Sequence, residues 1–221
     1  MDAVVKLLSR YIEEIELFNP AYGLVKVKDR RELIVRHILD SLAPLGIIRH
    51  LLDERPRAAN APAGPETPAI ADVGSGAGLP GIPLAICMPG AQFTLIERMG
   101  RRAGFLRNVA AVLSLPNVRV EETEMERAEG LFDVIVFRAF SPLKPAILKS
   151  LTNLLAPDGV ITAYKGRRES LEEELDRVFN KACISAGISG SGWETLSREI
   201  IPLEVPFLEE ERHLLLLRRA G

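Results

Sequence analysis

The chain has 221 residues, 47% of them hydrophobic, and a formal net charge of −2 at pH 7. This length suits one α/β domain with an extension or two small domains, and the near-neutral charge gives no global signature of nucleic-acid binding. No apolar run is long enough to span a bilayer and the N-terminus lacks a signal-peptide pattern, so we expect a cytoplasmic protein without a membrane partner. Cys87 and Cys183 lie far apart in apolar helical contexts, which suggests neither a disulfide nor a metal site.

The N-terminal part of the chain predicts a helical cap. Apolar residues at helical spacing predict a first helix over 2–18, and Asn19-Pro20 should end it. Asp29 suits the N-cap of a second helix over 30–41, and a third helical segment is expected over 43–52.

A segment rich in proline, glycine and alanine follows the cap. It covers residues 53–68 and predicts a linker or mobile loop. We therefore divide the chain into a helical cap (1–52), this linker and a cofactor-binding domain (69–221).

Strands and helices alternate through the third of these segments. The expected strands are 69–73, 92–97, 117–121, 132–137, 159–165, 194–203 and 211–219. The expected helices are 80–88, 100–114, 142–155 and 168–185. This alternation is typical of a mostly parallel sheet covered by helices on both faces, and the final two strands can pair as an antiparallel hairpin.

Four charged side chains fall at or directly after the carboxyl ends of the expected strands. They are Asp72, Glu97, Arg138 and Lys165. Ligands of open α/β sheets bind at these strand ends, so we expect the four side chains to surround one crevice.

A glycine-rich turn joins the first of these strands to the next helix, and it fits two cofactor patterns. The spacing Gly76-x-Gly78-x-x-Gly81 fits a dinucleotide loop, whereas Gly74-x-Gly76-x-Gly78 preceded by Asp72 fits an S-adenosylmethionine (SAM) loop. A carboxylate at this place would repel a pyrophosphate but favours the ammonium and sulfonium of SAM. The residues therefore favour SAM. Glu97 does not discriminate, because an acid after the second strand binds a ribose diol in either fold.

Several motifs occur in order along the chain and are similar to those of one protein family. They are Asn19-Pro20-Ala21-Tyr22, Arg36-His37-Ile38-Leu39-Asp40-Ser41, Asp72 to Ala85, Arg138-Ala139-Phe140, Lys165-Gly166 and Glu211-Arg212-His213. The chain resembles the bacterial 16S rRNA guanine-N7 methyltransferases, also called glucose-inhibited division protein B, over residues 15–217. One departure is Gly23-Leu24-Val25, where the family usually has Asn-Leu-Thr.

The resemblance implies an α/β class I SAM-dependent methyltransferase: a Rossmann-like, mostly parallel seven-stranded sheet with an antiparallel last strand. The implied reaction is methyl transfer to N7 of a guanine in the decoding-site loop of 16S rRNA. The cofactor contacts that it implies are Asp72, Gly74, Ser75, Gly76, Gly78, Leu79, Glu97, Met125 and Glu126. It places Asn19, His37, Arg138 and Lys165 near the active site.

Each of these residues also has a structural interpretation. Arg138 suits the SAM carboxylate, an RNA phosphate or a structural ion pair, and Lys165 a phosphate contact or base positioning. Asn19 either ends a helix or forms a hydrogen bond with the substrate. Without the family resemblance, His37 would be interpreted as a core histidine. Asp40 and Ser41 are possible caps of the next helix.

The expected partner is 16S rRNA within the 30S subunit, bound by a monomer that needs no metal. Basic residues that flank the crevice predict a phosphate-binding ring. They are Lys26, Lys28, Arg30, Arg31, Arg36, Arg98, Arg101, Arg102, Arg107, Arg167 and Arg168. Two other functions remain open at this point: a nicotinamide-dependent oxidoreductase, and a non-enzymatic RNA-binding or cell-division factor.

Overall fold

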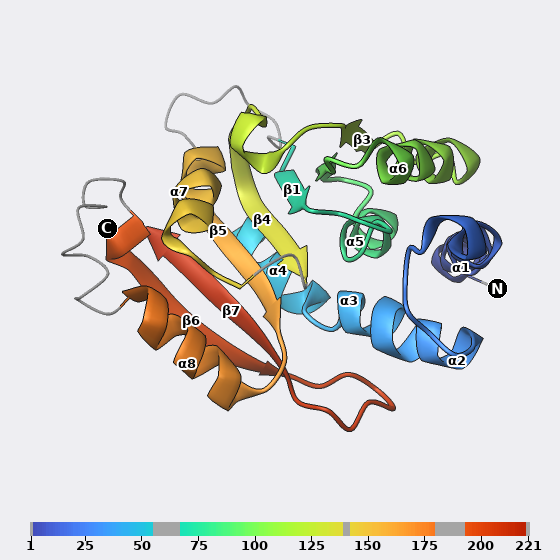
Figure 1. Cartoon of the computed structure of the whole chain (residues 1–221). Coiled ribbons are helices and arrows are strands. Elements are labelled where there is room, and N and C mark those ends of the chain that lie inside the picture. Colours follow the sequence, from blue (N-terminus) through green and yellow to red (C-terminus); the bar gives the residue numbers. More distant parts are fainter. Residues whose placement is uncertain (1, 55–66, 139–141, 180–192, 220–221) are drawn as a thin grey trace.

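The computed structural model describes residues 2–54, 67–138, 142–179 and 193–219 (Figure 1). The strands in these ranges form one seven-stranded sheet of order β3-β2-β1-β4-β5-β7-β6. Their bounds are β1 Ala69–Val73, β2 Gln92–Ile96, β3 Val118–Glu121, β4 Phe132–Arg138, β5 Leu155–Lys165, β6 Leu196–Leu203 and β7 Arg212–Arg219. The first five strands pair in parallel, and β7 runs antiparallel to both β5 and β6. The predicted α/β class and the antiparallel final hairpin are therefore confirmed.

Helices cover both faces of the sheet, as the alternation of strands and helices predicted (Figure 1). Their bounds are α1 Ala3–Tyr22, α2 Arg30–Leu33, α3 Asp40–Leu42, α4 Leu45–Asp53, α5 Gly81–Cys87, α6 Gly100–Val112, α7 Pro145–Leu154 and α8 Arg168–Phe179. The described helices include none that is long and apolar enough to cross a membrane. Residues 55–66 of the expected linker, 180–185 of the expected last helix, Cys183 and Ala139-Phe140 lie outside the described ranges.

Successive residues of the strands pack into two different cores, because neighbouring side chains of a strand point to opposite faces. Ala71 and Ile135 belong to the core that contains residues of α7 and α8. Ile70 and Val134 belong to the core that contains residues of α4 and α5. Strands that are buried on both faces explain why β1 and β4 read as nearly continuous apolar runs.

The first helix is longer than the sequence predicted. We expected Asn19-Pro20 to end it near residue 18, but α1 continues through Pro20 to Tyr22 and ends at Gly23, which has φ +59°. A proline in the last turn removes one hydrogen bond but leaves the rest of the helix intact. Left-handed Gly23, whose N–H donates to the carbonyl of Asn19 at 2.8 Å, is the actual stop signal.

The second predicted helix contains a π-helical turn that the sequence did not reveal. Asp29 is its N-cap, as expected, and accepts a hydrogen bond from the N–H of Glu32 at 2.8 Å. Between α2 and α3, however, Ile34–Leu39 forms a π-helix. Such turns change the direction in which side chains and carbonyls face, and they are frequent at functional sites.

Candidate functional site

A cavity of about 1210 Å³ opens at the carboxyl ends of the central strands. It brings together the glycine turn after β1, the π-helical turn, the ends of β4 and β5, and the start of β7. The predicted site residues that line it are His37, Gly74, Ser75, Gly76, Leu79, Arg138 and Lys165. Residues as far apart in the chain as His37 and Lys165 thus meet at one place. Of the four side chains expected at the strand ends, Arg138 and Lys165 line the cavity.

The glycine turn takes a conformation that other residues rarely adopt. Gly74, Gly76 and Gly78 have φ values of +69°, +58° and +90°. A Cβ on Gly78 would lie 2.6 Å from Ile82, whereas one on Gly76 would meet only the carbonyl of Gly74, at 3.8 Å. Gly78 therefore permits close packing of the protein itself, and Gly76 leaves open space beside the cavity for a ligand.

Asp72 lies beneath this turn and is fully buried. Its Oδ2 accepts a hydrogen bond from the N–H of Gly81 at 3.0 Å, while its Oδ1 has no partner among the described atoms. Burial raises the pKa of Asp72 to about 7. A carboxyl group thus occupies the start of α5, where a dinucleotide loop would place its pyrophosphate. This geometry favours a cationic ligand and fits the SAM interpretation.

Glu97 connects the turn to the next helix. Its Oε2 accepts from the N–H of Gly76 at 2.9 Å and its Oε1 from the N–H of Met99 at 2.8 Å. The side chain is 4% exposed and does not line the cavity. In this structure Glu97 fixes the turn against the start of α6, and its role as a ribose ligand stays a prediction.

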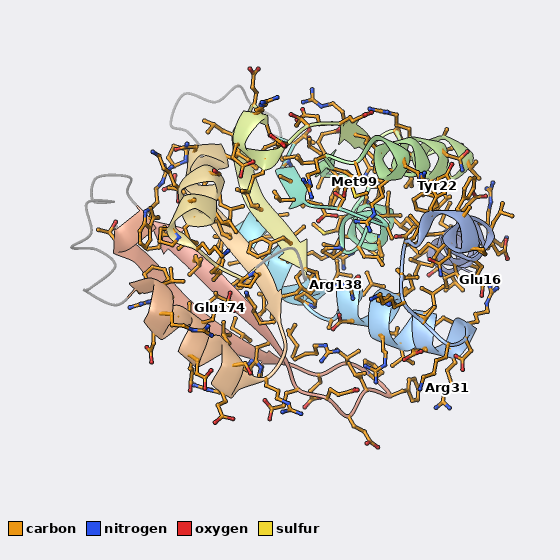
Figure 2. All side chains as sticks on the ribbon, in the orientation of Figure 1. Glu16, Tyr22, Arg31, Met99, Arg138 and Glu174 are labelled. Carbon is orange, nitrogen blue, oxygen red and sulfur yellow. The ribbon has the colours of Figure 1, made fainter. Side chains whose placement is uncertain are left out.

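Arg138, which is labelled in Figure 2, lies at the end of β4 and is held by three acceptors from one short segment. Its Nη1 donates to the carbonyl of Arg36 at 2.9 Å and to Oδ2 of Asp40 at 2.7 Å. Its Nη2 lies 2.8 Å from Nδ1 of His37. The π-helical turn supplies Arg36 and His37, and Asp40 follows it directly, so this local structure fixes the direction of the guanidinium.

His37 is a neutral hydrogen-bond acceptor in this arrangement. A guanidinium only donates, so Nδ1 of His37 must accept and the ring proton sits on Nε2. Burial, followed by the charge of Arg138, lowers the pKa of His37 to about 4. The histidine therefore stays uncharged at neutral pH.

Lys165, at the end of β5, forms an ion pair with Glu174 of α8, which is labelled in Figure 2. The ammonium donates to both carboxylate oxygens of Glu174, at 2.8 and 2.9 Å, and Oε1 also accepts from the N–H of Leu143. The Lys165 side chain is only 13% exposed. Lys165 lines the cavity with its charge already paired.

The remaining predicted residues do not line the cavity. Oδ1 of Asn19 accepts from the N–H of Val25 at 2.9 Å, so this side chain ties the last turn of α1 to the segment that follows it. Met125 belongs to a hydrophobic core, and its neighbour Glu126 is exposed. The cavity-lining residues do not include Asp72, Gly78, Glu97, Asn19, Met125 or Glu126.

The predicted basic ring is partly neutralised. Four of its arginines form ion pairs with carboxylates, namely Arg30, Arg36, Arg107 and Arg168. Arg101 lies over the ring of Tyr22, with 5.7 Å between the guanidinium carbon and the ring centroid. Lys26, Arg36 and Arg102 line the cavity.

Sequence reasoning missed three site residues: Asp40, Glu174 and Arg212. Asp40 was part of a quoted motif but was interpreted as a possible helix cap, and Glu174 was not singled out. A signal for Glu174 was present, because it lies three residues after Leu171 and four before Val178, both buried on α8. Arg212 was part of a recognised motif, but its partner Asp40 is 172 residues away.

Solved structures with similar folds are class I methyltransferases. Magnesium protoporphyrin IX methyltransferase from Synechocystis, solved with bound SAM, matches with a TM-score of 0.55 and 14% identity, over 99% of this chain and 98% of that one. A SAM-dependent methyltransferase from Aquifex aeolicus matches with a TM-score of 0.53 and 15% identity, over 82% of this chain and 92% of that one. These similarities establish the fold as that of class I SAM-dependent methyltransferases.

Proteins related in sequence identify the family as well as the fold. Ribosomal RNA small subunit methyltransferase G of Treponema pallidum is 39% identical over 217 residues, which cover 96% of this chain and 84% of the relative. The protein of the same name from Nitrosococcus oceani is 37% identical and covers 98% of this chain and 88% of the relative. The profile of the GidB family, described as rRNA small subunit methyltransferase G, matches residues 4–200. The chain therefore belongs to the rRNA small subunit methyltransferase G family.

Proposed function

We propose that this protein transfers the methyl group of SAM to N7 of a guanine in the decoding-site loop of 16S rRNA. The observation that carries the proposal is the juxtaposition in one cavity of the glycine turn above Asp72 with the fixed guanidinium of Arg138. In this proposal the cofactor binds at the glycine turn, and the substrate binds at the ends of the strands. Family membership over most of the chain supports the same reaction.

Two features of the glycine turn fit SAM as the ligand. Gly76 leaves open space beside the cavity, and Asp72 holds an unpartnered buried oxygen below it. Gly74, Ser75, Gly76 and Leu79 would hold the cofactor, with Asp72 and Glu97 supporting them. Met125 and Glu126 are proposed to border its adenine. When bound, SAM supplies an electrophilic methyl group on a sulfonium.

Methylation at guanine N7 demands little proton chemistry from the protein. N7 carries an in-plane lone pair and no proton, so its attack on the methyl carbon needs no general base. With SAM held by the glycine turn, the bond from N7 to the methyl carbon would form as the bond from that carbon to sulfur breaks, and the positive charge would pass to the base. A neutral His37 and a paired Lys165 agree with a site that works by alignment and exclusion of water.

The RNA must present N7 to the methyl group, so we expect the guanine to be turned out of its stack. Lys26, Arg102 and Arg138, which line the cavity, are proposed to contact phosphates or position the base. We further propose that the protein acts as a cytoplasmic monomer without a metal. The described residues contain no cluster of three or more His, Cys, Asp or Glu able to hold one.

The two other functions are not favoured. A nicotinamide-dependent oxidoreductase needs the start of α5 for a pyrophosphate, and Asp72 occupies it. A purely RNA-binding or cell-division factor does not fit relatives named as methyltransferases over more than nine-tenths of the chain.

Transfer of a labelled methyl group tests the proposal. The purified protein is incubated with methyl-labelled SAM and 30S subunits that lack the modification, with 50S subunits as the control substrate. We expect label in 16S rRNA only. Thermal shift with SAM and with NAD separates the cofactors: stabilisation by NAD alone, or no label in 16S rRNA, would contradict the proposal.

A further inference from the structure

One buried carboxylate holds two guanidinium groups at the edge of the cavity. Oδ2 of Asp40 accepts from Nη1 of Arg138 at 2.7 Å, and Oδ1 accepts from Nε of Arg212 at 3.0 Å. The Asp40 side chain is 5% exposed, and those of the two arginines are 14% and 21% exposed. Three distant segments meet here: the end of β4, the start of β7 and α3.

The charges of this group do not balance. One carboxylate faces two guanidinium groups, and neutral His37 adds no charge. The other cations at this edge have their own partners, because Arg36 pairs with Glu32 and Glu210, and Lys165 with Glu174. Within the group of Asp40, Arg138 and Arg212, one positive charge therefore remains in a partly desolvated place, where electrostatic attraction is strong. Arg36 has two carboxylate partners, Glu32 and Glu210, whose side chains are more exposed, at 25% and 46%.

Both arginines also retain free donors. A guanidinium has five N–H donors. Arg138 uses three, on Arg36, His37 and Asp40, and Arg212 uses one on Asp40 and one on the carbonyl of Glu211. The other donors of both side chains have no protein partner among the described residues, and both arginines line the cavity.

We propose that Arg138 and Arg212 form one oxyanion-binding site of which Asp40 is the positioning residue. Its ligand is a single oxyanion that both guanidiniums bind, and Asp40 fixes their relative orientation. This inference rests on the proposed function, because the two oxyanions that reach the cavity there are a phosphodiester of the RNA and the carboxylate of SAM. Planar guanidinium groups suit either ligand, since both accept two parallel hydrogen bonds.

Equilibrium binding of the full chain tests the proposal without turnover. Arg212→Gln is compared with wild type in calorimetry with SAM and in binding to 30S subunits across a range of salt concentrations. Loss of a charge-assisted contact is expected to weaken one of the two affinities by about tenfold or more. The matched control is Arg119→Gln, because Arg119 lies on β3 with a side chain that is 69% exposed.

The two ligands give different results, and each supports the site. If a phosphodiester is bound, 30S affinity falls, its logarithmic salt slope is reduced by about 0.7 to 1, and SAM affinity is unchanged. If the cofactor carboxylate is bound, SAM affinity falls and the salt slope stays as in wild type. Unchanged SAM affinity and unchanged 30S binding in a folded Arg212→Gln protein would overturn the proposal.

Asp40→Asn tests the positioning role, because it retains the shape and one acceptor oxygen but loses the charge that both arginines share. We expect it to weaken the same affinity that Arg212→Gln weakens, without altering the salt slope, since both cations remain.

If Arg212→Gln does not fold, Arg212→Lys replaces it, and an affinity equal to wild type would then refute the site. Failure of wild type to methylate 16S rRNA would instead count against the proposed function.

Discussion

The hydroxyl of Tyr11, on α1, donates a hydrogen bond of 2.7 Å to the carbonyl of Ala77 in the glycine turn. Tyr11 is fully buried, and its burial raises the pKa of the phenol, which therefore remains a donor. Tyr11 also packs in one core with Ile82 of α5 and Phe105 of α6. The N-terminal helix thus supports the turn that we propose to bind SAM.

Removing this hydroxyl should loosen the turn. Tyr11→Phe leaves the Ala77 carbonyl without its donor in a buried place, so we expect a loss of about 1–2 kcal/mol in the free energy of unfolding. SAM affinity should fall several-fold. Urea denaturation and calorimetry measure the two effects. Tyr22→Phe is the control, since the Tyr22 ring contacts Phe18 and Arg101. If Tyr11→Phe has the unfolding free energy and the SAM affinity of wild type, Tyr11 does not support the glycine turn.

A methyl group at Gly81 should be far more damaging than one at Gly46. A Cβ on Gly81 would lie 2.5 Å from Leu95 and 2.6 Å from Oδ2 of Asp72, whereas one on Gly46 would meet nothing within 4 Å. We expect Gly81→Ala to lower thermal stability strongly and to weaken SAM binding. Gly46→Ala, in helix α4, should raise stability by up to about 1 kcal/mol. Equal melting temperatures for the two variants would show that the packing beneath the turn is not as described.

SAM binding should depend on pH through Asp72. Burial raises the pKa of Asp72 from 3.8 to about 7, and a cationic ligand favours the ionised form. Below pH 7 binding must release the proton, so the association constant should rise by up to about tenfold per pH unit between roughly pH 5.5 and 7. Calorimetry at several pH values, in buffers of different ionisation enthalpy, measures this release.

In the protein without SAM, the contribution of Asp72 to the free energy of unfolding should fall as the pH rises, whereas SAM affinity increases. Unfolded Asp72 ionises near pH 3.8, while the folded protein retains the proton up to about pH 7. The contribution of Asp72 to the free energy of unfolding is therefore fully present below about pH 4 and is lost as the pH rises through 7. Asp72→Asn should remove both dependences. A pH-independent SAM affinity in wild type would contradict the assignment of Asp72.

Glu174 should matter more than its exposed neighbour on α8. It accepts from Lys165 at 2.8 and 2.9 Å and from the N–H of Leu143, so Glu174→Gln leaves the largely buried ammonium without its counter-charge. We expect a loss of about 1–3 kcal/mol in the free energy of unfolding and slower methyl transfer. Glu173→Gln, at an exposed position, is the control. The two variants are compared by urea denaturation and by initial rates, and equal results would refute the role of Glu174.

The sequence predicted the elements of the fold well because the buried strands carry strong local signals. β1 and β4 lie within one residue of their expected bounds, since each is an apolar run between turn residues. The end of α1 was predicted wrongly, because the stop signal is the left-handed conformation of Gly23 and not Pro20. The π-helical turn at 34–39 has no distinct pattern of residue types and was missed.

The site was predictable in part from the strand ends, but the partners that hold these side chains were not predictable. Arg138 and Lys165 were expected in the crevice and line the cavity. Their partners Asp40 and Glu174 were not expected there, because Asp40 is 98 residues from Arg138 and the contact of Glu174 depends on how α8 packs against the end of β5. The roles of Met125 and Glu126, and the division into cap, linker and cofactor domain, stay predictions.

Mapping the modified nucleoside tests the central claim most directly. 16S rRNA that lacks the modification is incubated as 30S subunits with the protein and SAM, digested to nucleosides and fragments, and analysed by mass spectrometry. We predict one 7-methylguanosine per 16S rRNA, in the decoding-site loop, and none without the protein. A methyl group on another atom or in another RNA, or unmodified 16S rRNA despite bound SAM, would contradict the account.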